Sequence, residues 1–221
     1  MRLPARDCIA SFDVDAQCTF TELCPDELPV KGGQDIAAAL NAQARLASLR
    51  VGSKDAHSPH ALWITRNPDE IGQAPVQLPD DSDKTLANMD VCWPPHAVPG
   101  TQGFELIPGL PPVTDYDYFV WKGVEVDMHP YGACYHDLAE RLSTGVIEFL
   151  RAREITTVLV GGLATDYCVK TTALQLARAG FDVILNLAAC RGIAEASCAQ
   201  AISEMRAAGI QVVDQLSAEA A

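Results

Sequence analysis

The chain has 221 residues, of which 48% are hydrophobic, enough for one α/β domain (1–221) that buries a sizeable core. Its formal net charge of −13 argues against nucleic acid or an anionic membrane as the main partner, because both repel an acidic surface. No apolar run approaches the ~20 residues that span a bilayer, and the first residues lead into a polar stretch rather than a signal-peptide core.

Strand-like and helix-like stretches alternate along the chain. Strands are predicted at 8–14, 49–54, 117–121, 155–160, 182–187 and 210–213, and helices at 34–48, 144–153, 166–179 and 194–208. The apolar run at 155–160 is unbroken, which is typical of a strand buried on both faces of a parallel sheet. This order predicts an α/β fold with a doubly wound, mostly parallel sheet and helices on both faces. The polar, proline-bearing segment 67–89 is interpreted as a long loop over the site.

One cysteine lies where such a fold binds ligands. Gly161 and Gly162 are expected to turn the chain after the buried strand, and Thr165 is a suitable N-cap for the helix that follows. Cys168 would then lie in the first helical turn, at the carboxyl edge of the sheet. Backbone N–H groups and the helix dipole would stabilise a thiolate there. Most free cysteines, however, are simply small buried hydrophobes.

Polar residues stand at the ends of three other predicted strands. Asp15 ends the first strand, although Asp13 shares its face and strand alternation cannot choose between them. Lys122 ends the strand at 117–121, where a lysine is usually solvated. Asp55 and His57 follow the second strand, and a carboxylate and an imidazole so spaced can bind one cation. A polar surface loop explains that pair equally well.

Four segments resemble the nicotinamidases and other isochorismatase-like cysteine hydrolases. They are DVDAQCTF at 13–20, WPPH with GTQG within 93–103, VWKGVEVDMHPY at 120–131, and GLATDYCV at 162–169. The resemblance extends over roughly 9–213 and implies a three-layer α/β/α fold. These segments lie far apart in the sequence, which makes accidental agreement improbable.

The resemblance implies a set of catalytic residues. Cys168 would be the nucleophile, Asp15 the general base and Lys122 the third catalytic residue, which keeps Asp15 ionised. A cis peptide would precede Ala164. The backbone N–H groups of Ala164 and Cys168 would form the oxyanion hole.

It also implies a metal site. Asp55, His57 and His96 would bind one divalent ion, for which Zn²⁺ is the first choice and Fe²⁺ or Mn²⁺ are alternatives. Some nicotinamidases have a further histidine a few positions after the Asp-x-His pair, which makes His60 an additional candidate ligand.

Three aromatic residues would line the pocket for the substrate ring: Phe20, Trp93 and Tyr131. The chain departs from the family after Tyr131, because Gly132-Ala133-Cys134 replaces a pattern that often ends in phenylalanine. This departure leaves the exact substrate open. It also leaves open whether Cys134 modulates Cys168.

The implied activity is hydrolysis of nicotinamide to nicotinate and ammonia through a thioester on Cys168, a reaction of NAD salvage. An amidase acting on another small amide or carbamoyl compound is the main alternative. The candidate metal ligands Asp55, His57 and His96 argue against an isochorismatase. A non-catalytic, thiol-bearing binding or redox-sensing protein is a further alternative, because the chain has eight cysteines. None of these cysteines forms a CxxC pair, which favours reduced thiols and a cytoplasmic location. A homo-oligomer is left open.

Overall fold

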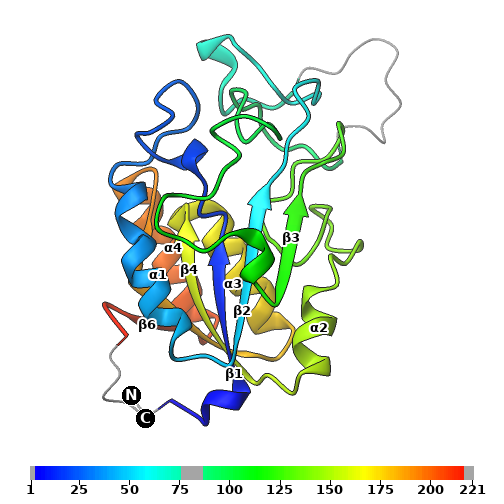
Figure 1. The fold of residues 1–221 in the computed structure, drawn as a ribbon. Coiled ribbons are helices and arrows are strands. Elements are labelled where there is room, and N and C mark those ends of the chain that lie inside the picture. The colour runs from blue at the N-terminus through cyan, green and yellow to red at the C-terminus, as the bar shows by residue number, and fades with distance from the viewer. Residues whose placement is uncertain (1–2, 76–86, 217–221) are drawn as a thin grey trace.

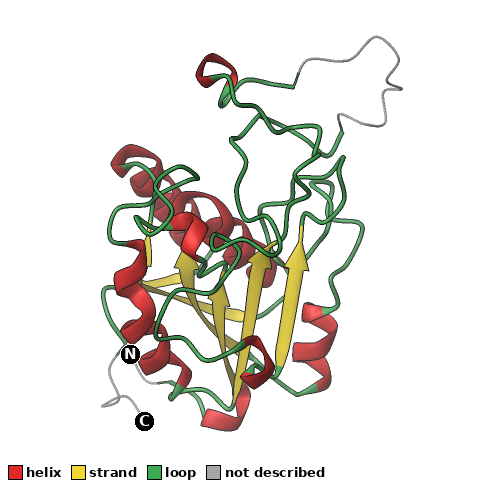
Figure 2. Cartoon of the chain, turned by 45° about the horizontal axis from the view of Figure 1, so that its top comes forward, coloured by secondary structure: helices red, strands yellow, loops and turns green. Residues whose placement is uncertain are grey.

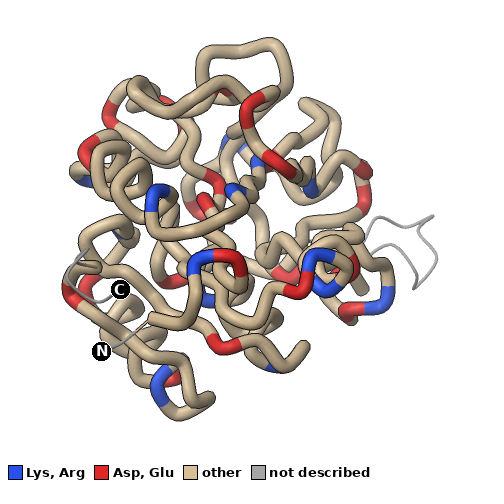
Figure 3. Tube along the Cα trace, turned by 60° about the horizontal axis from the view of Figure 1, so that its bottom comes forward, with Lys and Arg blue, Asp and Glu red and all other residues tan. Residues whose placement is uncertain are grey.

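The structure, a computed structural model, describes residues 3–75 and 87–216. Residues 76–86, within the segment interpreted as a long loop, lie outside the described residues. Within the described part of the chain, no helix is long and apolar enough to cross a membrane. Acidic and basic positions are interspersed along the chain (Figure 3).

Six parallel strands form one sheet (Figure 1). In chain order they are β1 Ile9–Val14, β2 Leu49–Asp55, β3 Tyr118–Lys122, β4 Thr157–Leu163, β5 Asp182–Arg191 and β6 Gln211–Val213. Their order across the sheet is β3-β2-β1-β4-β5-β6. The predicted doubly wound parallel sheet is therefore confirmed, with strand bounds close to those expected from the apolar runs.

Helices cover both faces of the sheet. The helices are α1 Ala37–Ala44, α2 Val146–Ala152, α3 Lys170–Arg178 and α4 Glu195–Ala207. The main apolar cluster joins α2, α3 and α4 to one face, where Phe12 and Val160 are buried. Two smaller clusters cover the other face, and Leu40 of α1 is buried in one of them. The result is the expected three-layer α/β/α arrangement.

The end of β4 differs from the expected turn. Gly161 and Gly162 lie inside the strand, and the chain leaves the sheet only after Leu163. Added Cβ atoms there would lie 2.7 Å from Ala189 Cβ and 1.9 Å from the backbone oxygen of Val14. The glycine pair is thus explained by close approach of neighbouring strands.

The helix after β4 also begins differently from expectation. Ala164, not Thr165, is its N-cap, and its first turn, Thr165–Val169, is π-helical. The Leu163–Ala164 peptide is cis, as the resemblance implied. Cys168 lies inside this π-helical turn, a feature often found at functional sites.

The carboxyl ends of the strands point toward a cap of loops (Figure 2). From β1 the chain proceeds to β2 and β3 on one side, while β4, β5 and β6 continue on the other. The strand order therefore reverses between β1 and β4. In open α/β sheets, ligands bind in the crevice at such a reversal.

Candidate active site

Four neighbouring strands, in the order β3-β2-β1-β4, each lead to one polar side chain at the carboxyl edge. Asp55 and Lys122 are the last residues of β2 and β3, and they are paired in register. Asp15 directly follows β1 and has a φ of 44°, so its side chain no longer follows strand alternation. Cys168 follows β4 by one helical turn. All four residues are buried.

The Lys122 ammonium joins these side chains. Its Nζ lies 3.0 Å from Asp15 Oδ2 and 3.7 Å from Cys168 Sγ, and it donates to Asp55 Oδ1. It also donates to the carbonyl of Pro130 at 3.2 Å. One oxygen of each carboxylate and the Cys168 sulfur lie within 4.8 Å of one another. The predicted convergence of Asp15, Lys122 and Cys168 is therefore present.

Burial determines how the acid and the thiol titrate. Burial raises the pKa of the Cys168 thiol well above its ordinary value, although Lys122 opposes the shift. Burial likewise raises the pKa of Asp15, and again Lys122 opposes it. Burial alone would lower the pKa of Lys122, but the two carboxylates beside it raise it well above its ordinary value.

The raised pKa favours the neutral thiol of Cys168, whereas a thiolate was expected from its helical position. Lys122 lowers the pKa of Asp15 as expected, but the desolvation penalty is larger, so the net shift of the Asp15 pKa is upward. A base with a raised pKa is better matched to a thiol whose pKa is also raised. A nucleophilic Cys168 would therefore have to pass its proton to a neighbouring group.

The structure separates the two candidate aspartates. Asp13 accepts from Arg50 at 2.6 Å and from the Tyr116 hydroxyl at 2.9 Å. Asp13 lies within β1. Asp15 faces Lys122 instead and accepts a hydrogen bond from the Ser53 hydroxyl at 2.6 Å. Of the two acids, Asp15 is the one beside the cysteine.

A group of three buried histidines adjoins this cluster. Ring nitrogens of His57, His96 and His129 lie within 4.8 Å of one another. His57 Nδ1 lies 3.0 Å from the Gly123 carbonyl, and His96 Nδ1 lies 2.8 Å from the Pro94 carbonyl. In each ring, Nδ1 can therefore carry the proton and leave Nε2 as a lone-pair donor.

This group fits a divalent metal ion. His57 Nε2 is buried without a hydrogen-bond partner among the described residues, and Asp55 Oδ1 lies 3.5 Å from it. Burial, followed by the neighbouring His57, lowers the pKa of His96 to about 3, so that this imidazole is neutral. Neutral imidazoles with a carboxylate are a donor set that Zn²⁺ and related ions accept.

The second group of three donor residues, Asp15, Asp55 and Cys168, already surrounds a cation. Lys122 Nζ contacts all three side chains. A metal ion there would have to displace a buried ammonium. The histidine side of Asp55 is consequently the better candidate for a metal.

The structure does not place His60 with the other histidines. His60 is exposed, on the loop after His57. His129, which the sequence analysis missed, lies beside His57 and His96 instead. Its only signal in the sequence was its place in the segment resembling the family's pocket loop, since it follows no periodic pattern.

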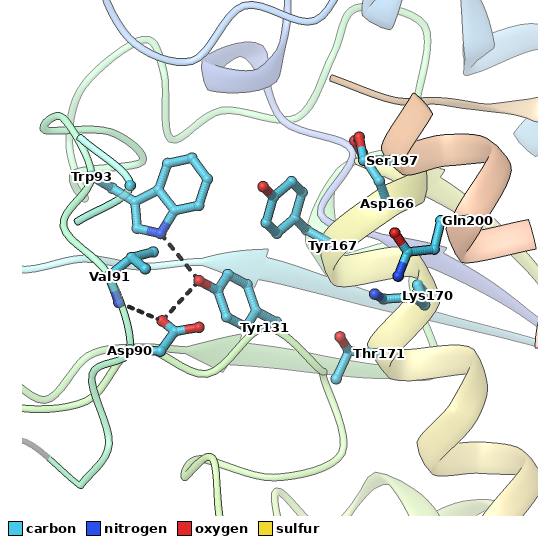
Figure 4. Close-up of a pocket in the computed structure, with 11 residues that line it drawn as sticks. Asp90, Val91, Trp93, Tyr131, Asp166, Tyr167, Lys170, Thr171, Ser197 and Gln200 are labelled. Atoms are coloured by element: carbon cyan, nitrogen blue, oxygen red, sulfur yellow. Dashed lines mark hydrogen bonds between the residues drawn. The ribbon is translucent and has the colours of Figure 1, made fainter. Parts of the chain in front are cut away.

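Two adjoining cavities lie beside the site, and Cys168 lines one of them. The inner one, about 20 Å³, is lined by Phe20, His129 and Cys168 among others, and it is large enough for a water molecule only. The outer one, about 370 Å³, is lined by α3 and α4 residues and by Asp90 (Figure 4). The walls that both cavities share are Trp93, Tyr131 and Tyr167.

The three predicted pocket aromatics lie where the resemblance implied. Phe20, Trp93 and Tyr131 all line the inner cavity, and so does Ala164 of the expected oxyanion hole. Trp93 Nε1 donates to the Tyr131 hydroxyl at 3.2 Å, and that hydroxyl donates to Asp90 at 2.9 Å (Figure 4).

Cys134 is not among the residues that line these cavities. It is buried in the main apolar cluster, and its backbone N–H donates to Gln175 at 3.1 Å. Burial raises the pKa of its thiol. Cys134 is therefore an inert core thiol.

Comparisons with known proteins agree with this geometry. The isochorismatase domain matches residues 10–216. A nicotinamidase of Acinetobacter baylyi is 31% identical over 215 residues, which are 96% of this chain and 94% of that protein. The structure of a nicotinamidase/pyrazinamidase of Acinetobacter baumanii has a TM-score of 0.78 at 28% identity, over 94% of this chain and 96% of the other. A zinc complex of the Pyrococcus horikoshii pyrazinamidase has a TM-score of 0.72 at 27% identity, over 95% and 99% of the two chains. The chain therefore belongs to the isochorismatase-like hydrolases and, within them, to the nicotinamidase family.

Proposed function

We propose that the chain is a metal-dependent cysteine amidohydrolase, folded as one domain, that converts nicotinamide to nicotinate and ammonia. The observation that carries this proposal is the buried Lys122 ammonium, which lies between Asp15, Asp55 and Cys168 directly beside the histidine group. A purely structural core would rarely bury four such groups together, because each charge has a desolvation cost. The names of its relatives support the choice of substrate.

In the proposed mechanism, Asp15 takes the thiol proton as Cys168 Sγ attacks the amide carbon. The backbone N–H groups of Ala164 and Cys168 hold the resulting oxyanion, a contact worth ~3 kcal/mol in other enzymes. Asp15 returns the proton to the departing ammonia, and water then hydrolyses the thioester to nicotinate. Lys122 compensates the negative charge that passes between the thiol and Asp15.

The metal would be held by Asp55, His57 and His96. When bound, a divalent ion supplies a Lewis-acid position for a pyridine nitrogen. We propose Zn²⁺, in keeping with the imidazole-rich donors, with Fe²⁺ and Mn²⁺ as alternatives. Phe20, Trp93 and Tyr131 would enclose the flat ring. Because the inner cavity has room for a water molecule only, ring binding requires movement of the walls shared with the outer cavity, where Tyr131 and Tyr167 are half-buried.

A related amidase acting on an aliphatic amide or carbamoyl compound is the second candidate, because Gly132-Ala133-Cys134, directly after the pocket residue Tyr131, departs from the family's pattern. The two candidates differ in what orients the substrate. Nicotinamide has a ring nitrogen for the metal, benzamide has the ring alone, and a carbamoyl compound has neither.

The test is ammonia release from nicotinamide, pyrazinamide, benzamide and an aliphatic carbamoyl compound, with and without a metal chelator. We expect nicotinamide and pyrazinamide to be hydrolysed about 100-fold faster than benzamide, because a ~1 Å error in carbonyl position costs that much. The chelator should remove the activity. Turnover of the carbamoyl compound alone would refute the nicotinamidase assignment.

A further inference from the structure

His129 is the histidine of the group that no sequence motif identified. Its ring is buried, with 4% of its surface exposed, and it packs on Trp63 at a centroid distance of 4.2 Å. Tyr131 meets it edge-on at 5.0 Å, and the His57 ring lies 5.3 Å away. The imidazole is therefore surrounded by Trp63, Tyr131 and the rings of the other two histidines, of which His96 lies 6.1 Å away.

The backbone around His129 is held at three consecutive residues. Trp63 Nε1 donates to the Met128 carbonyl at 3.1 Å, and the His129 N–H donates to the Asn88 carbonyl at 2.8 Å. The Pro130 carbonyl accepts from the catalytic-site Lys122 at 3.2 Å. These contacts position the ring before any ligand binds, which is a requirement for a precise binding site.

One polar atom of this ring lacks a partner. His129 Nδ1 is buried and, among the described residues, makes no hydrogen bond. A buried nitrogen without a partner costs about 1–3 kcal/mol, so such an atom calls for an explanation. A second nitrogen in the same group, His57 Nε2, is also without a partner. Both would be satisfied by one cation between the rings.

We propose that His129 is a ligand of the divalent ion, as a third imidazole beside His57, His96 and Asp55. This inference rests on the metal-dependent function proposed above. A site with three imidazoles and one carboxylate prefers different divalent metal ions from a site with two imidazoles and one carboxylate. Imidazole suits Zn²⁺, Co²⁺ and Ni²⁺, whereas Mn²⁺ and Mg²⁺ prefer oxygen donors, so His129 makes the site more selective for the former ions.

The experiment measures metal affinity directly, by competition with a chromogenic chelator. His129→Phe keeps an aromatic ring against Trp63 but removes the donor nitrogens, and His129→Ala removes both. Removing an outer-shell partner of a metal ligand typically weakens metal binding about 10- to 100-fold, and removing a ligand itself should reach at least the upper end of that range. Each variant should therefore bind Zn²⁺ and Co²⁺ about 100-fold more weakly than the wild type. Mn²⁺ affinity should fall much less. The matched control is His60→Ala, which removes the exposed histidine and should leave all affinities unchanged.

A second measurement uses the wild type alone and does not depend on the folding of variants. The Co²⁺-loaded protein should show three paramagnetically shifted, exchangeable imidazole N–H signals, one for each histidine ligand. Two such signals, or equal Zn²⁺ affinity in His129→Phe and wild type, would overturn the inference while leaving the proposed function intact. Wild type that binds no metal, yet hydrolyses nicotinamide with chelator present, would instead remove the metal-dependent function and this inference together.

Discussion

Replacing Lys122 with methionine should destabilise the metal-free protein more than any other single change of charge in the site. The ammonium is fully buried and lies 3.0 Å from Asp15 Oδ2, and it also bonds the Asp55 carboxylate. Methionine fills similar volume but leaves two buried carboxylates without compensation. Breaking a buried ion pair from one side typically costs 3–5 kcal/mol, so we expect a loss of ~4 kcal/mol in the free energy of unfolding.

The assay is urea unfolding of metal-free protein at pH 7, followed by circular dichroism. Lys54→Met is the matched control, because Lys54 is also a buried lysine of the same sheet and has no ion pair among the described residues. Its Nζ lies 4.3 Å from the centre of the Phe104 ring, and losing that contact should cost about 1 kcal/mol. The double variant Lys122→Met/Asp15→Asn should recover part of the loss, since one uncompensated charge is removed. A loss for Lys122→Met no larger than that for Lys54→Met would refute the electrostatic reading of this cluster.

Three further outcomes follow from the same geometry. Asp15→Asn should abolish turnover, whereas Asp13→Asn should lower stability and spare turnover, because Asp13 pairs with Arg50 away from the thiol; steady-state kinetics on both variants would show the reverse ranking if the base were misassigned. The pKa of His96 is about 3 in the folded protein and 6.5 ordinarily, so between pH 3 and 6.5 the unfolded chain binds more protons than the folded one. The free energy of unfolding of the metal-free protein should therefore fall as the pH falls from 6.5 to 3. His96→Gln should flatten that slope by up to ~1.4 kcal/mol per pH unit. Gly162→Ala should lower the free energy of unfolding by ~4 kcal/mol or prevent folding, because its Cβ would lie 1.9 Å from a β1 backbone oxygen. Gly209→Ala has open space around it and should lower the free energy of unfolding by about 1 kcal/mol. Equal shifts in melting temperature for the two variants would contradict the close-approach explanation.

Much of the fold was predictable because its signals are local. β4 begins as a short apolar run, and the alternation of strand-like and helix-like segments allowed the six strands and their parallel arrangement to be inferred. The rule that parallel strands end at one edge then predicted that Asp15, Lys122 and Cys168 would meet. For Asp15 the motif was essential, since strand periodicity did not separate it from Asp13.

The features that sequence reasoning missed depend on contacts between distant residues. Gly161 and Gly162 look like a turn, and only the close approach of β1 and β5 keeps them in the strand. His129 lies in a segment without periodicity, held by bonds to Trp63 and Asn88, which are far away in the sequence. The raised pKa of Cys168 likewise comes from burial by the loop cap and the sheet, which a sequence motif does not measure.

The central claim is that the thiol of Cys168 attacks the amide of nicotinamide. The most direct measurement compares ammonia release from nicotinamide by the wild type and by Cys168→Ala, both folded and carrying equal amounts of metal. Alanine fits the space of the buried thiol and leaves the metal residues in place, so the variant should bind metal as the wild type does. We predict rapid release by the wild type and none above background by the variant. Comparable turnover by Cys168→Ala would contradict the account.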